Sequence, residues 1–143
     1  MALERNDPHL NFRFQVEIEG VIVGGFSQVS GLSVEIETEE LREGGENTFP
    51  HRLPRGARYP NLVLRRGITD SDLLWTWCDE TVQGHVSRKR ASILLLDSEG
   101  EEKWRWNVRN ALPVRWSGPG LHAAGHGVAF ESLELSHEGI QKG

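Results

Sequence analysis

The amino-acid sequence predicts a mainly β protein, an antiparallel β-sandwich or barrel-like domain with one α-helix at about residues 70–83. Two observations support this fold class. Several segments alternate apolar and polar residues, which is typical of half-buried strands. One stretch, residues 58–84, combines a strand, a turn and a helical pattern of apolar residues. Because an isolated helix of this length is marginal in water, we expect it to pack against a sheet.

The helix has start and stop signals in the sequence. Thr69 is predicted as the N-cap, with Asp72 at the capping-box position three residues later. Gly84 stands where a C-terminal glycine is expected. The residues at helical spacing form one mainly apolar stripe: Leu73, Leu74, Trp77, Cys78 and Thr81. This stripe is the predicted contact with the sheet.

The segments before the helix are predicted as strands. The first has its apolar side chains on alternate positions: Phe12, Phe14, Val16 and Ile18. Residues 21–23 continue the sheet after a turn at Gly20, and the next strand places Val34 and Ile36 on one face. Leu62 and Leu64 give the strand before the helix its apolar face.

The segments after the helix are also predicted as strands. Residues 93–96 form a continuous apolar run, as expected for a strand covered on both faces, and residues 97–100 form a hairpin turn. Residues 103–109 and 112–116 follow as two strands, with Trp104 and Trp106 on the core side of the first. In the last strand the apolar parity changes, which predicts a β-bulge near Glu131 and Ser132.

Length and charge limit the classes of protein. The 143 residues suit a single domain, with residues 1–10 as a flexible N-terminal arm. A net charge of −5 disfavours a general nucleic-acid binder. One cysteine excludes an intrachain disulfide. The first residues contain no apolar signal-peptide core, and no run is long enough to span a membrane, so we expect synthesis in the cytoplasm without a membrane anchor.

Residues 43–60 are predicted as a long loop, because glycine and proline interrupt them and no period is visible. An acidic strand runs directly into this basic loop, and the charges either neutralise each other within one subunit or join neighbouring subunits. The candidate inter-subunit contacts are Glu35, Glu37, Glu39, Arg42, Glu43, Gly44, Gly45, Glu46, Arg52, Arg55 and Arg58. The plainer interpretation of the glutamate row is a solvated strand face.

Each residue that could take part in catalysis or cofactor binding is better explained by a structural role. Ser71 has no histidine nearby in sequence and fits the start of the helix. His122 and His126 lie in a glycine-rich segment without the glutamate of a metalloprotease motif. Cys78 belongs to the helix stripe, where a small core residue is the expected role. We therefore predict a non-enzyme without catalytic, metal or cofactor residues.

Strand edges are the more informative feature. A small sheet protein with long amphipathic strands offers edges to other chains, and head-to-tail pairing of identical subunits closes into rings when the rotation closes. The sequence therefore favours a self-associating structural module.

Specific motifs occur in a characteristic order along the chain. They are REGG within residues 42–45, NLVLRRGITDS within 61–71, Gly118-Pro119 and the closing LELSHEG within 133–139. With them the chain resembles the tail tube proteins of contractile-tailed bacteriophages and the inner tube proteins of phage-tail-like contractile injection systems. The resemblance covers roughly residues 11–140.

This resemblance implies a single tail-tube domain over residues 1–143, assembled into hexameric rings that stack into a hollow tube. The implied partners are a sheath protein, baseplate or tube-initiator proteins, and a tape-measure protein or effector cargo in the lumen. The implied location is a phage tail or an injection particle. The polar face of the glutamate row or the Arg105 face is expected to line the lumen.

Three alternatives remain open at this point. A baseplate-proximal tube initiator would share the fold and cap the tube. A secreted effector carrier would form discrete rings that never stack. An enzyme or sugar-binding β-sandwich is the third, and a specific small-molecule thermal shift would support it.

Overall fold

The computed structural model describes residues 12–41, 51–120 and 129–143, which form ten strands and one helix. All the strand pairs are antiparallel, and seven strands follow the order β2-β1-β7-β8-β9-β6-β3, with β10 also paired to β8. The strands are β1 (Arg13–Ile18), β2 (Val21–Phe26), β3 (Gln28–Ser30), β4 (Glu35–Leu41), β5 (His51–Arg58), β6 (Leu62–Gly67), β7 (Lys89–Leu96), β8 (Glu102–Ser117), β9 (Phe130–Ser136) and β10 (Ile140–Lys142). The mainly β prediction is confirmed.

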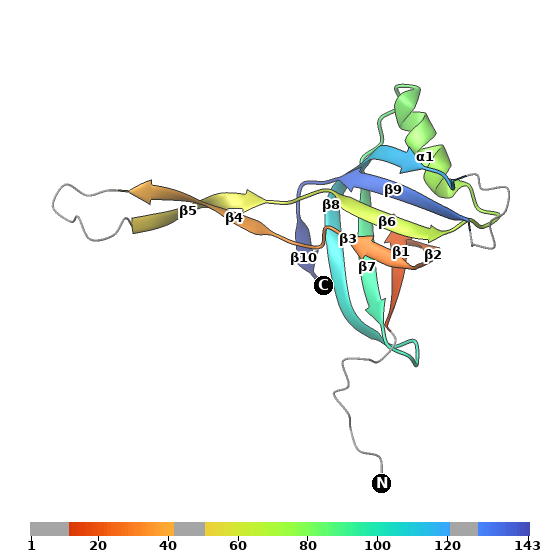
Figure 1. Ribbon diagram of the computed structural model, residues 1–143, viewed down its shortest axis with the longest axis horizontal. Coiled ribbons are helices and arrows are strands. Elements are labelled where there is room, and N and C mark those ends of the chain that lie inside the picture. The colour runs from red at the N-terminus through yellow and green to blue at the C-terminus, as the bar shows by residue number, and fades with distance from the viewer. Residues whose placement is uncertain (1–11, 42–50, 121–128) are drawn as a thin grey trace, which may run out of the picture.

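The two ends of this strand order meet in the chain, because only Ser27 separates β2 from β3. The backbone N–H and the hydroxyl of Ser27 both donate to the carbonyl oxygen of Arg65 on β6, at 2.9 and 3.1 Å. The sheet therefore curls round until its first and last strands are continuous, which gives the barrel-like body in Figure 1.

Strand β8 turns the corner of this barrel. Its first half pairs with β7 and its second half with β9, and the register shifts between Pro113 and Arg115. Asn110, between the two halves, has a positive φ of 50°. The two strands predicted over residues 103–109 and 112–116 are thus one continuous strand, which bends instead of ending.

The bulge predicted in β9 near Glu131 and Ser132 is wrong. The β6–β9 register is unbroken, and Glu131 lies on the same buried face as Leu133 and Leu135. The apolar alternation looked interrupted in the sequence because the core position before Leu133 is occupied by a charged residue, Glu131. The irregular strand at this seam is β8, opposite β9.

The core fills the barrel and continues under the helix α1 (Leu73–Val82). Alternate residues of β1, β6 and β9 are buried, as their alternation predicts, whereas β7 buries four successive residues, from Ala91 to Leu94. The largest fully buried side chains are Val16, Leu62, Leu64, Leu74, Ile93, Val108, Leu133 and Leu135. Trp77, 3% exposed, anchors the helix and donates its indole N–H to the carbonyl oxygen of Ser87 at 3.0 Å.

The helix begins later than predicted and ends as predicted. Asp72 is the N-cap, without a side-chain capping bond, so the prediction of Thr69 as the cap is wrong. Thr69 instead accepts from the N–H of Ser71 at 3.2 Å, in the turn before the helix. At the other end, Gly84 has φ +91°, and the N–H of Gly84 and of His85 bond back to the helix in a Schellman arrangement.

Trp104 departs from its predicted core position. It shares the core parity of β8 yet is 45% exposed, at the start of the strand. Its ring stacks on Trp106 with centroids 5.4 Å apart, and the Lys142 ammonium lies 4.4 Å from the Trp104 ring centroid. Parity shows which face a residue occupies, whereas burial depends on how far the barrel extends over that face.

Strands β4 and β5 form a separate two-stranded ribbon that projects from the barrel, on the left of Figure 1. The loop predicted over residues 43–60 is therefore wrong for residues 51–58, which are β5. Pro54 and Gly56 are accommodated because the strand has a register shift and no third strand beside it. At the base, the Tyr59 ring lies 5.7 Å from that of His137, which also bonds the Pro60 carbonyl at 3.0 Å.

Candidate interaction surface

The β4–β5 hairpin presents two different faces, because successive residues of a strand point to opposite sides. Ile36 lies opposite Ala57 on one face, which is apolar near the base of the hairpin. Glu35 opposite Arg58, followed by Glu37 opposite Gly56, occupies the other face. The hairpin is thus amphipathic although neither face is buried.

Part of the predicted acidic and basic contact set meets within one chain. Arg52 lies 3.9 Å from Glu40, and Arg55 lies 3.7 Å from Glu39. All four side chains are more than half exposed, and such surface pairs contribute about 0–1 kcal/mol each. Arg58 has no ion pair among the described residues, although it faces Glu35 in the register. The intrachain pairs align the two strands and contribute little to stability.

The other predicted contact residues fall into two groups. Glu35 and Glu37 lie exposed on β4. The remaining five lie outside the described residues: Arg42, Glu43, Gly44, Gly45 and Glu46. The described part of the predicted contact surface is therefore one projecting hairpin, with acidic residues on β4 and basic residues on β5.

Large apolar side chains are exposed along this hairpin and just before it. Val34 is 53% exposed, Ile36 62%, Leu41 43% and Leu53 46%. A two-stranded hairpin is marginally stable in water by itself, and it gains stability by packing against another element. Among the described residues the chain supplies no such element, so the hairpin is suited to contact another molecule.

The outer face of β1, β7 and β8 carries a set of polar side chains, some of which are paired with one another. Arg105 donates to Glu17 at 3.1 Å and to Glu102 at 2.7 Å. Both carboxylates raise the pKa of Arg105, and Glu102 has the larger effect. Ser92 donates to Asn107 at 2.8 Å on the same face. This face suits contact with water or a passing solute better than contact with an apolar partner.

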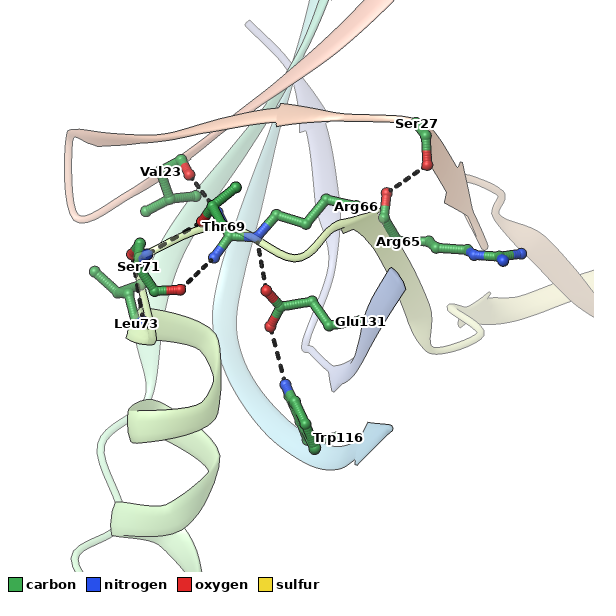
Figure 2. Close-up of polar contacts among 9 residues, drawn as sticks. All are labelled: Val23, Ser27, Arg65, Arg66, Thr69, Ser71, Leu73, Trp116 and Glu131. Atoms are coloured by element: carbon green, nitrogen blue, oxygen red, sulfur yellow. Dashed lines mark hydrogen bonds and ion pairs between the residues drawn. The ribbon is translucent and has the colours of Figure 1, made fainter. Parts of the chain in front are cut away.

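A buried ion pair, missed by the sequence analysis, joins the barrel to the start of the helix (Figure 2). Arg66 and Glu131, each 3% exposed, are cross-strand partners on β6 and β9 and lie 3.1 Å apart. Arg66 also donates to the carbonyl oxygens of Val23 at 2.6 Å and Ser71 at 3.5 Å, while the Trp116 indole donates to Glu131 at 3.0 Å. The signal was present, because both charged residues continue the apolar parity of their strands.

The geometry of the chemically notable residues gives no catalytic arrangement. The Ser71 hydroxyl accepts from the N–H of Leu73 at 3.4 Å, within the turn before the helix. Burial, and then the neighbouring Asp79 carboxylate, raises the pKa of the Cys78 thiol, which opposes formation of a nucleophilic thiolate. No group of three potential metal ligands lies together in residues 12–41, 51–120 and 129–143. His122 and His126 lie outside these ranges.

No helix in the described part of the chain is both long and apolar enough to cross a membrane.

Comparison with known structures gives matches along the whole chain. One is a chain of the sheath-tube complex of an extracellular contractile injection system, PVC, in the extended state, with 26% identity, a TM-score of 0.82 and coverage of 99% of this chain and 93% of that one. Another belongs to the anti-feeding prophage cap, the AFP tube terminating cap, with 26% identity, a TM-score of 0.83 and coverage of 100% and 94%.

A more distant match shares the fold alone. Hcp1 from Flavobacterium johnsoniae is 15% identical, with a TM-score of 0.57 and coverage of 92% of this chain and 94% of that one. Comparison with curated protein sequences gives no match.

The family model of the T4-like virus tail tube protein gp19 matches residues 10–141, nearly the whole chain. The family and the structural neighbours are structural tube proteins and not enzymes. The resemblance seen in the sequence is confirmed, and the chain belongs to the T4-like tail tube protein family as a tail tube protein of contractile injection systems.

Proposed function

We propose that copies of this chain form hexameric rings, that the rings stack into a hollow tube, and that the β4–β5 hairpin makes contacts between copies. The observation that carries this proposal is the hairpin itself, which is exposed along its whole described length and amphipathic. The family and the match to a sheath-tube complex support a tube with a sheath around it and a baseplate and cap at its ends.

The tube lumen would pass effector cargo or hold a tape-measure protein. The polar outer face around Arg105 and Glu17 is the better candidate for the lumen wall, since the exposed apolar residues of β4 favour protein contact. Its Arg105, Glu17 and Glu102 side chains are paired within the chain, while Arg90 and Arg109 on the same face have no ion pair among the described residues and leave it with basic charge. We place assembly in the cytoplasm, before the particle acts there or is released.

Electron microscopy of a charge-reversed variant tests the role of the hairpin. In negative stain, the purified wild-type protein should form hollow tubes or stacked six-fold rings. Arg55→Glu with Arg58→Glu should leave a folded monomer, because like charges would then line both strands and repel an acidic partner surface. The matched control, Arg55→Lys with Arg58→Lys, keeps both charges and should still form tubes.

Each outcome has a defined meaning. Normal tubes from the charge-reversed variant would show that the hairpin arginines do not control assembly. A wild-type chain that stays monomeric at every concentration and salt would contradict self-assembly.

A tube-end component is the second candidate, because one match lies in the AFP tube terminating cap and another in the PVC sheath/tube terminator, where identity is 27% and the TM-score is 0.83. Single rings that never elongate, even at high protein concentration, would favour this role over a main tube subunit.

A further inference from the structure

A concavity of about 510 Å³ lies on the outer face of β1, β7, β8 and β10. A row of cross-strand neighbours crosses its floor: Glu17 on β1, Ser92 on β7, Asn107 on β8 and Gln141 on β10. Ser92 is 8% exposed, and its hydroxyl donates to the Oδ1 atom of Asn107 at 2.8 Å. The Asn107 NH₂ group and the Gln141 side chain have no hydrogen-bond partner among the described residues. The floor is therefore polar, fixed by the sheet, and able to bond a ligand.

Arginines on both sides of this floor give the concavity its charge. Arg105 precedes Asn107 by two residues on β8 and Arg109 follows it by two, so the three side chains share one face of the strand. Arg105 is already bound to two carboxylates of its own chain. Arg90 on β7 and Arg109 are exposed and have no ion pair within the described part of the chain. These two charges are therefore available to a ligand.

The two available arginines oppose each other across neighbouring strands. The β7–β8 register shifts at Arg90, which is opposite the two β8 residues Arg109 and Asn110. The Arg109 guanidinium donates to the carbonyl oxygen of Glu138 at 3.0 Å, a bond that holds the side chain and uses one of its five N–H donors. Like charges directly opposite each other in a sheet are destabilising. An anion bound between the guanidiniums would remove this repulsion, so the pair is suited to receive one.

The anion that this arrangement fits best is a carboxylate of an extended polypeptide. Guanidinium groups bind carboxylates through paired, charge-assisted hydrogen bonds. The Asn107 and Gln141 amides can bond the peptide backbone between two acidic residues. A nucleic-acid strand fits less well, because it carries closely spaced phosphates and would bring them against the Glu17 carboxylate in the floor.

We propose that the concavity between Arg90 and Arg109 binds the carboxylates of an acidic, extended polypeptide segment. This inference rests on the proposed tube function and gives the lumen wall a binding site for acidic parts of a polypeptide passenger. Every copy of the chain would contribute the same site. A long acidic segment would then contact several weak sites at once, which holds it more firmly than one site does.

Fluorescence anisotropy with a labelled peptide tests the site. The probe is a decapeptide that alternates glutamate and serine, and its control alternates glutamine and serine. We expect the wild-type monomer, at physiological ionic strength, to bind the glutamate peptide at least tenfold more tightly than the glutamine peptide. Arg90→Gln with Arg109→Gln should weaken binding of the glutamate peptide at least tenfold. Circular dichroism should stay that of the wild type, because both side chains are exposed.

The matched control variant is Arg65→Gln with Arg115→Gln. It removes the same total charge from two exposed barrel positions, and neither arginine lines the concavity. We expect this variant to bind the glutamate peptide as the wild type does. Equal losses of affinity from the two double variants would indicate general attraction between opposite charges and would overturn the site.

A labelled single-stranded decanucleotide of DNA tests the class of ligand. We expect it to bind the wild-type monomer more weakly than the glutamate peptide does. Tighter binding of the DNA, lost in the Arg90→Gln, Arg109→Gln variant, would show that the concavity takes phosphates and would overturn its assignment to an acidic polypeptide.

Cosedimentation of the labelled peptide with assembled tubes separates the site from the proposed function. We expect the glutamate peptide to sediment with wild-type tubes. Tubes that form normally from a chain that binds no peptide in either state would overturn the site and leave the tube function standing. A chain that binds the peptide but never assembles would overturn the tube and leave the site. Binding by the monomer and not by the tube would show that a neighbouring copy covers this face, which would overturn its place in the lumen wall.

Discussion

The buried ion pair of Arg66 and Glu131 is expected to be important for the stability of the barrel. Removing one member of a buried ion pair leaves the other charge desolvated, which costs about 3–5 kcal/mol. Glu131→Ala would leave Arg66 in this position and also remove the acceptor of the Trp116 indole. We expect the free energy of unfolding to fall by about 3–5 kcal/mol in urea denaturation at a concentration where the chain is monomeric.

The control for this prediction lies on the same strand. Glu134 is half-buried on the opposite face of β9 and accepts from the exposed Asn61 amide at 2.9 Å. Glu134→Ala should change the free energy of unfolding by only about 0.5–1 kcal/mol. Equal losses from the two substitutions would show that the buried pair has no special role in stability.

The same pair marks a limit of prediction at the residue scale. Arg66 and Glu131 continue the core parity of Leu64 and Leu133, so their burial was accessible from alternation. Their contact was not, because it depends on the register that pairs β6 with β9, 65 residues apart in sequence. Alternation describes one strand, and only the sheet topology decides which charges meet.

Elements were predictable where local chemistry decides them. Gly84 correctly marked the helix end, because the left-handed conformation at that point favours glycine. The helix start was misplaced, since the residues after Thr69 form a turn linked to Arg66 and not a first helical turn. Strand β5 was missed because Pro54 and Gly56 resemble a loop, while its pairing with β4 is a long-range property.

The candidate surface was predictable to the same extent. The charged composition of residues 35–58 indicated a contact region, but the hairpin geometry was not readable from it. A groove beside the helix was not predicted at all, because its lining comes from β1, β2, α1 and the start of β7, and only the folded barrel brings these together.

The segment that leads from the barrel strand β3 to the hairpin strand β4 begins at Gly31, and its path depends on this glycine. Its φ is +90°, and a Cβ there would overlap the backbone carbonyl of Asn61, just before β6. Gly31→Ala should therefore lower the free energy of unfolding by more than the roughly 1–2 kcal/mol of left-handed strain. The loss should appear in thermal denaturation, with reduced assembly if the hairpin is redirected.

Gly20 supplies the comparison for that substitution. Its φ is +77°, but no heavy atom lies within 4 Å of the point that an added Cβ would occupy. Gly20→Ala should cost only the conformational strain, about 1–2 kcal/mol. If the two substitutions were equally destabilising, close packing at the crossing would not be what requires Gly31.

The whole molecule divides into a stable body and an unsupported projection. The barrel curls until β2 and β3 are continuous, which leaves its strands little open edge, whereas β4 and β5 pair only with each other. The core residues all lie in the barrel and helix, and every residue of the hairpin strands is exposed. Assembly is therefore expected to stabilise the hairpin far more than the barrel.

Hydrogen exchange measures this division directly. In the dilute monomer, amides of β4 and β5 should exchange close to the unprotected rate, because an isolated hairpin opens at little cost. In the assembled tube they should slow at least tenfold, while the buried amides of β7 stay slow in both states and serve as the internal reference. Protection of β4 and β5 in the monomer would show that the hairpin is stable by itself. Rapid exchange in the tube would show that assembly leaves it uncovered, so the contacts between copies would have to lie on the barrel.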